Sequence, residues 1–291
     1  MTLLMFTRPI VPRPYTPADQ PAVLSLLAHT HFLHRHLDWQ DQETLLASND
    51  LIAGVGIDNA AIAAFLALSM PVGGISWLRL AALDQGVSRG PALRRLWQGL
   101  QPAVVQHNVQ RVYALPANEQ YQPALSSLGF KPVAQIVLMR LMPAQTPRPD
   151  TPPHPYVIRS AEPDDLECIL ALDHAAFEPL WWFSPQELRA ALHMATAFKL
   201  AFASDKLIGY AIAHTRGEQG HISRLATHPA QQGMGIGSIL LHDVLTGLLS
   251  QNMPTITVNT QARNTGSQRL YRRFGFTLTG EQWPIYELLV S

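Results

Sequence analysis

The 291-residue sequence is poor in cysteine, in net charge and in long apolar runs. Its one cysteine, Cys168, excludes an intrachain disulfide, and the helical pattern "DLECILAL" around it predicts a buried, unreactive thiol. The 21 basic and 21 acidic side chains balance, which argues against a nucleic-acid or anionic-membrane partner. No apolar run approaches the about 18 residues of a membrane span, and no signal-peptide pattern follows the first methionine. We therefore expect a soluble, cytoplasmic protein with no membrane partner.

A proline-rich segment divides the sequence into two similar halves. The stretch "PAQTPRPDTPPHP" from Pro143 contains six prolines and predicts a stiff, extended spacer. Before it, "VPRPYTPADQ" resembles "VIRSAEPDDL" after it, at a shift of 146 residues (Arg13 to Arg159). Further on, "LRLAAL" resembles "SRLATH" at a shift of 145 residues. Such a repeat predicts two copies of one domain, over residues 1–142 and 155–291, with a linker over 143–154.

Helices and strands are expected to alternate in the second copy. The predicted strands cover 156–159, two arms of a hairpin within 198–216, 220–229 and 255–261, with two more closing the chain after 275. The predicted helices cover 163–176, 185–194, 237–250 and 266–274. This order predicts an α/β fold in which helices flank a mixed sheet.

A glycine-rich stretch, "QQGMGIG", joins a predicted strand to an apolar helix. Its glycines are Gly233, Gly235 and Gly237, and glycines at such a turn either shape it or cradle a phosphate. A P-loop is excluded because Ser238, not lysine, follows the last glycine. A Rossmann site is disfavoured by the glycine spacing and by the next strand, which ends in Asn259 and Thr260 without an acidic residue.

Two motifs in this order resemble those of the GCN5-related N-acetyltransferase (GNAT) superfamily. The signature Gln/Arg-x-x-Gly-x-Gly/Ala is matched by residues 232–237, "QGMGIG". The second signature, an Asn before a Leu-Tyr helix that ends in Gly-Phe, is matched by Asn264, Leu270, Tyr271, Gly275 and Phe276. The resemblance covers about 156–290 and extends to the first half through the repeat. It implies two tandem GNAT-like domains, each a mixed, mostly antiparallel sheet flanked by helices (α/β, α+β).

The resemblance implies acetyl-CoA as cofactor and assigns its binding residues. Backbone N–H groups and the positive end of the helix would hold the pyrophosphate, without a metal. The residues concerned are Gln232, Gly233, Met234, Gly235, Ile236, Gly237 and Ser238. Leu225, Ala226 and Thr227 would pair with the pantetheine arm through their backbone. Asn264 either contacts the cofactor or caps the following helix.

Candidate catalytic and acceptor residues follow from the same resemblance. Tyr271 would protonate the departing sulfur, or else it packs in the core. His221 stands where some family members have a glutamate base, with a structural role as the alternative and Glu218 as another candidate. Trp181 and Trp182 lie where the family builds its acceptor site and would line a pocket or join the core.

The first half is expected to have lost the reaction. Its glycine stretch is reduced to "VSRGPA", and Leu125 replaces Tyr271. It is predicted to bind coenzyme A poorly, if at all, and not to catalyse transfer. Four histidines in "HTHFLHRH" are expected to scatter around a helix, where they solvate or pack and hold no metal.

The sequence thus predicts an acetyl-CoA-dependent N-acetyltransferase whose C-terminal domain acetylates a primary amine of a small molecule or peptide. The tandem arrangement with one degenerate copy also resembles mycothiol synthase. The alternative is a non-catalytic acyl-CoA-binding or regulatory protein. The sequence leaves open the acceptor, the general base and the oligomeric state.

Overall fold

The computed structural model describes residues 9–36, 41–48, 50–116, 121–143 and 154–290. The chain forms two compact units, one of Met1–Ala134 with Trp283–Ser291 and the other of Gln135–Gln282. These units differ from the predicted ranges, since residues 135–142 group with the second unit and the last nine residues with the first. Most of the predicted linker, 144–153, lies outside the described residues.

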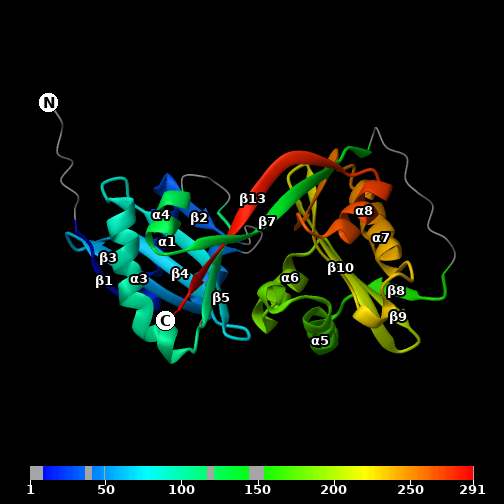
Figure 1. Cartoon of the computed structure of the whole chain (residues 1–291), viewed down its shortest axis with the longest axis horizontal. Coiled ribbons are helices and arrows are strands. Elements are labelled where there is room, and N and C mark those ends of the chain that lie inside the picture. Colours follow the sequence, from blue (N-terminus) through cyan, green and yellow to red (C-terminus); the bar gives the residue numbers. More distant parts are fainter. Residues whose placement is uncertain (1–8, 37–40, 49, 117–120, 144–153, 291) are drawn as a thin grey trace. The chain divides into compact units, whose positions relative to one another are not determined.

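The first unit is a sheet with helices on it (Figure 1). Its strands are β1 (Val11–Pro14), β2 (Phe32–Arg35), β3 (Leu51–Asp58), β4 (Ala61–Ser69), β5 (Ile75–Leu83) and β6 (Arg111–Ala114). Its helices are α1 (Gln20–His29), α2 (Gln42–Ala47), α3 (Arg89–Gln106) and α4 (Gln122–Ser127). The strand order is β1-β3-β4-β5-β6, with β2 also paired to β5. The β5–β6 pair is parallel and the others are antiparallel.

The second unit repeats this plan. Its strands are β7 (Lys131–Leu141), β8 (Val157–Ser160), β9 (Ala197–Ala203), β10 (Lys206–Arg216), β11 (Gln219–Thr227) and β12 (Thr255–Gln261), in the order β7-β12-β11-β10-β9-β8. Its helices are α5 (Leu166–Ala176), the short η5 (Pro179–Trp181), α6 (Pro185–Met194), α7 (Ile236–Ser250) and α8 (Thr265–Arg273). Figure 1 shows α7 and α5 on opposite sides of β10. Accordingly, Tyr210 of β10 contacts Asp173 of α5, and its neighbour Gly209 lies against Leu240 of α7.

One strand from each half of the sequence completes the sheet that the other half forms. Residues 136–141 of β7 pair with β12 in the second unit. The last strand, β13 (Thr277–Leu289), pairs its residues 286–289 with β6 in the first unit. The sequence analysis predicts two closing strands, whereas the structure has one long strand. Gly280 within it has a φ of +88°, a conformation that favours glycine.

The internal repeat is visible in matching contacts. Arg13 pairs with Asp19, and Arg159 pairs with Asp165, with the same Nη2–Oδ1 distance of 2.6 Å. The strand register differs from the sequence alignment of the two copies at one position. The 145-residue shift aligns Arg79 with Arg224. In the sheets, Ala67 pairs with Leu80, and the matching Ile212 pairs with Arg224. Leu80 therefore occupies the place of Arg224.

Two smaller expectations are wrong. Cys168 is exposed, with its Sγ donating to the carbonyl oxygen of Asp165 at 3.1 Å, because it faces away from the apolar side of α5. The four histidines do not share a helix, since α1 ends at His29 and the chain continues into β2. There His34 is buried, with its Nε2 3.1 Å from the carbonyl oxygen of Leu78. No helix in the described ranges is long and apolar enough to cross a membrane.

Candidate functional site

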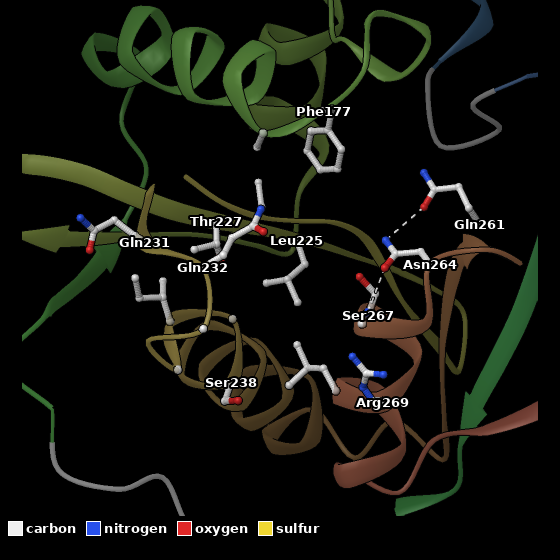
Figure 2. Close-up of a pocket in the computed structure, with 18 of the residues that line it drawn as sticks. Phe177, Leu225, Thr227, Gln231, Gln232, Ser238, Gln261, Asn264, Ser267 and Arg269 are labelled. Carbon is white, nitrogen blue, oxygen red and sulfur yellow. Dashed lines mark hydrogen bonds between the residues drawn. The ribbon is translucent and has the colours of Figure 1, made fainter. Parts of the chain in front are cut away.

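A cavity opens in the second unit where two parallel strands part. β11 and β12 pair from Gln219–Thr255 to Ile222–Val258, and no later pair joins them in the described chain. On its other edge β12 stays paired with β7 as far as Gln261. The cavity has a volume of about 1030 Å³ and is lined by the end of β11, the glycine stretch, the first turn of α7, the β12–α8 turn, α8 and the segment after α5. Figure 2 shows these elements around it.

The three glycines of the stretch are required for two different physical reasons. Gly233 and Gly235 have φ values of +83° and +82°, and Gly235 is the N-cap of α7. Residues with a side chain rarely adopt this conformation. Gly237 is different, because a Cβ there would lie 3.3 Å from Cδ2 of Leu270 in α8. The glycines therefore set the sharp entry into α7 and its close packing on α8.

The start of α7 fits a phosphate group. Ile236 and Gly237 belong to the first turn of the helix, where backbone N–H groups lack intrahelical acceptors and the helix dipole is positive. The Ser238 N–H instead donates to the carbonyl oxygen of Gly235 at 2.9 Å, so its hydroxyl is the group left for the cavity. Two arginines of α8, Arg269 and Arg273, also line the cavity and add positive charge. A diphosphate can be bound here by amides and cations alone.

The end of β11 supplies a free backbone edge. Leu225, Ala226 and Thr227 pair with β10 on one side and line the cavity on the other. Beyond Ile222 the β12 side of this strand has no partner strand among the described residues. An extended chain such as the pantetheine arm can therefore pair with it as a further strand would.

Asn264 is a helix cap at the edge of the cavity. Its Oδ1 accepts a hydrogen bond from the Ser267 N–H at 3.0 Å, and its Nδ2 donates to Oε1 of Gln261 at 3.3 Å (Figure 2). All three residues line the cavity. Of the two roles left open by the sequence, the cap contact is present in the structure.

Aromatic side chains form the wall that follows α5. Phe177 and Trp181 line the cavity, together with Glu178, the one carboxylate among its described lining residues. Trp182 does not line it. Its Nε1 donates to the carbonyl oxygens of His174 at 3.1 Å and Phe177 at 2.9 Å, so it closes the end of α5.

Besides Trp182, three further predicted site residues lie outside the lining. Tyr271 is buried among apolar side chains, with its ring 5.8 Å from that of Phe276, and this burial raises the pKa of its hydroxyl. His221 lies near the opposite end of β11, with its Nδ1 2.9 Å from Oγ1 of Thr257. Met234 is 56% exposed and is also absent from the lining. Glu218 is exposed in the β10–β11 turn.

The charged lining residues are not among those that the sequence motifs predict. Glu178 and Arg263 form an ion pair of 2.7 Å at the cavity, and Arg269 and Arg273 follow on α8. The spacing of the last two, one helical turn apart beside Leu270, was the available signal. Within the described residues no group of three or more His, Cys, Asp or Glu side chains could hold a metal.

Comparisons with known proteins agree with this architecture. Residues 159–276 match the family model described as "Acetyltransferase (GNAT) family". This match lies within the second unit and identifies a GNAT domain there. It is similar to a GCN5-related N-acetyltransferase from Sphaerobacter thermophilus, with 18% identity, a TM-score of 0.60 and coverage of 96% of this chain and 95% of that one. The GNAT fold thus extends over both units.

Two further similar proteins are a tandem GNAT protein and a mycothiol acetyltransferase. A "Tandem GNAT protein from the clavulanic acid biosynthesis pathway" is 15% identical, with a TM-score of 0.63 and coverage of 96% of this chain and 98% of that one. The mycothiol acetyltransferase of Acidimicrobium ferrooxidans is 30% identical over 122 residues, 40% of this chain. That match spans only 34% of the relative. The fold of the chain is thus similar to that of a tandem GNAT protein.

Proposed function

We propose that this protein is an acetyl-CoA-dependent N-acetyltransferase that acetylates a primary amine of a small molecule or peptide in its second unit. The observation that carries the proposal is a single cavity that joins the glycine stretch, the free edge of β11 and the aromatic segment after α5. The match of residues 159–276 to the GNAT acetyltransferase family supports acyl transfer. The relative named mycothiol acetyltransferase supports the acetyl group and a small-molecule acceptor.

The lining residues have complementary tasks in this proposal. The first turn of α7 and the α8 arginines would bind the phosphates, and the backbone of Leu225 to Thr227 would hold the pantetheine arm. Acetyl-CoA, when bound, would supply an acetyl group already activated as a thioester. Holding this arm in line with the acceptor wall would provide the proximity that such transfers depend on.

In this proposal water and Tyr271 transfer the protons, and Glu178 attracts the ammonium ion. An alkylamine, with a pKa of about 10.4, arrives as an ammonium ion and must lose a proton before it attacks. Glu178 lines the cavity and would attract this cation, with water as the proton acceptor. Tyr271 is proposed as the proton donor to the departing sulfur. Burial raises the pKa of this hydroxyl, which therefore carries its proton at neutral pH. The proposal requires the hydroxyl to reach the cavity, which the neighbouring Leu270 lines.

The test is an acceptor panel with acetyl-CoA. Amino sugars, cysteine conjugates of sugars, α-amino acids, polyamines and short peptides are incubated with the protein, while free thiol is followed by a colorimetric reagent. Acetylated amine is identified by mass spectrometry. Amine-dependent thiol release supports the proposal. Binding of acetyl-CoA by calorimetry with no thiol release above background for any amine would instead support a non-catalytic acyl-CoA-binding protein.

A further inference from the structure

A buried polar network joins α5, β10 and β11 in the second unit. The side chain of Asp173 has no solvent exposure, and that of Arg224 is 11% exposed. Nε and Nη2 of Arg224 donate to Oδ1 of Asp173 at 3.0 and 2.6 Å. The hydroxyl of Tyr210 donates to the same carboxylate oxygen and accepts from Nε of Arg224 at 3.3 Å. These three polar side chains therefore satisfy one another's hydrogen-bonding groups in the interior.

This network holds the aromatic segment that lines the cavity. The N–H of Phe183 donates to Oδ2 of Asp173 at 2.9 Å, and Nη2 of Arg224 donates to the carbonyl oxygen of Trp181. The Arg224 guanidinium also lies over the rings of Phe177 and Phe183, 3.9 and 4.2 Å from their centroids. Arg224 directly precedes the cavity-lining Leu225. One side chain therefore connects the aromatic wall to the strand edge opposite.

The first unit shows that the fold does not require this network. The repeat and the strand register place Leu27, Phe65 and Leu80 at the positions of Asp173, Tyr210 and Arg224. All three are buried in one apolar cluster of the first unit. A buried charge network is costly to desolvate, and apolar residues of similar size are often as stabilising or more so. The presence of charges at these three positions in only one copy thus calls for a role beyond folding.

The geometry points to Arg224 and Asp173 as positioning residues that fix the acceptor wall, Phe177 to Phe183, against the end of β11. The identification of this wall with the acceptor side rests on the proposed function. The rigid fork of the guanidinium orients the wall more sharply than an ammonium can. A displacement of about 1 Å at a reacting centre can cost about a hundredfold in rate. The network would therefore act on acceptor binding and orientation rather than on acetyl-CoA.

The first unit supplies the variant that tests this inference. The triple substitution Asp173→Leu, Tyr210→Phe and Arg224→Leu installs the apolar trio of the sister copy. We expect cooperative unfolding and an unchanged acetyl-CoA affinity by calorimetry. Amide hydrogen exchange of Trp181 to Phe183 should accelerate about tenfold, because two of the groups that hold this segment are removed. The KM for the best panel amine should rise about tenfold, with the KM for acetyl-CoA unchanged.

Arg224→Lys is the second variant, because it keeps the charge and loses the fork and the stacking. It should shift the acceptor KM and the exchange in the same direction by a smaller factor. A folded triple variant that keeps the exchange protection of this segment and the acceptor KM would overturn the inference. If the wild type acetylates no amine, the proposed function fails, and the exchange measurement still decides whether the network positions the wall.

Discussion

Arg224 makes two hydrogen bonds to a single oxygen of Asp173, a carboxylate with no solvent exposure, through Nε at 3.0 Å and Nη2 at 2.6 Å. Removing the carboxylate alone leaves a buried guanidinium without its counter-charge. We predict that Asp173→Leu lowers the free energy of unfolding by about 3–5 kcal/mol, measured by urea denaturation. The triple variant with the apolar trio should recover most of this loss. If Asp173→Leu were as stable as the triple variant, the interaction energy between Asp173 and Arg224 would be negligible.

The left-handed backbone at Gly235 leads to a prediction about cofactor binding. Gly235→Glu introduces a side chain at a φ of +82° and a negative charge at the start of α7. Acetyl-CoA binding should become undetectable by calorimetry, because the carboxylate repels the pyrophosphate. Gly247→Glu is the matched control, since it adds the same charge to α7 outside the cavity lining, where a Cβ meets no atom within 4 Å. Equal affinities for the two variants would contradict the assigned site.

A hydroxyl deletion separates catalysis from packing at Tyr271. Tyr271→Phe keeps the ring against Phe276 and removes the proposed proton donor. We expect kcat to fall by about a hundredfold or more with unchanged acetyl-CoA affinity, in steady-state assays with the best panel amine. Tyr286→Phe, at a buried tyrosine of the first unit, serves as the control and should leave kcat unchanged. Wild-type kcat in Tyr271→Phe would mean that the proton comes from elsewhere.

The cap at Asn264 gives a prediction about stability. Its Oδ1 accepts from the Ser267 N–H at 3.0 Å at the start of α8. Asn264→Ala should lower the free energy of unfolding by about 1 kcal/mol, whereas Asn264→Asp should retain the cap and most of the stability. Denaturant unfolding of both variants measures this difference. A loss of equal size in both would show that the cap is not the stabilising contact.

Burial of His34 predicts destabilisation by acid. Burial lowers the pKa of this imidazole to about 4, and the nearby Arg79 adds to the effect. The unfolded value is about 6.5, so the unfolded chain binds the proton first, and stability falls as the pH drops from about 6.5 to about 4. The loss attributable to His34 is about 3 kcal/mol at the lower end. In His34→Gln the free energy of unfolding should depend less steeply on pH over this interval. An unchanged slope would mean that other groups cause the acid destabilisation.

Local sequence patterns predicted the local elements of the second unit. The helix at Pro185–Met194 and the strand at Thr255–Gln261 were predicted with their observed bounds, because capping residues and alternating apolar residues mark them. Most of the glycine stretch lines one cavity together with Leu225 to Thr227 and Asn264, while Met234 lies outside the lining. These features depend on residues close together in the sequence.

What the sequence did not reveal depends on long-range contacts. Asp173 and Arg224 are 51 residues apart, and nothing local to either predicts their pairing. The aspartate on the apolar side of the helix "LECILALDHAA" was the available sign, because a charge on the buried side of a helix requires a partner. The sequence also predicted wrongly that Cys168 is buried, because Cys168 lies at the edge of the apolar side of α5. The helical period does not by itself give the orientation of a residue at the edge of the apolar side.

The pairing of β7 with β12 and of β13 with β6 has a consequence for dissecting the protein. Cleavage of the backbone after residue 143 would leave each sheet lacking one of its strands, because that strand belongs to the other fragment. Neither half is then an autonomous folding module, and each fragment made alone would expose an unsatisfied sheet edge prone to aggregation. Made together, the two halves are expected to complement each other as a split protein, held by the exchanged strands in place of the covalent link.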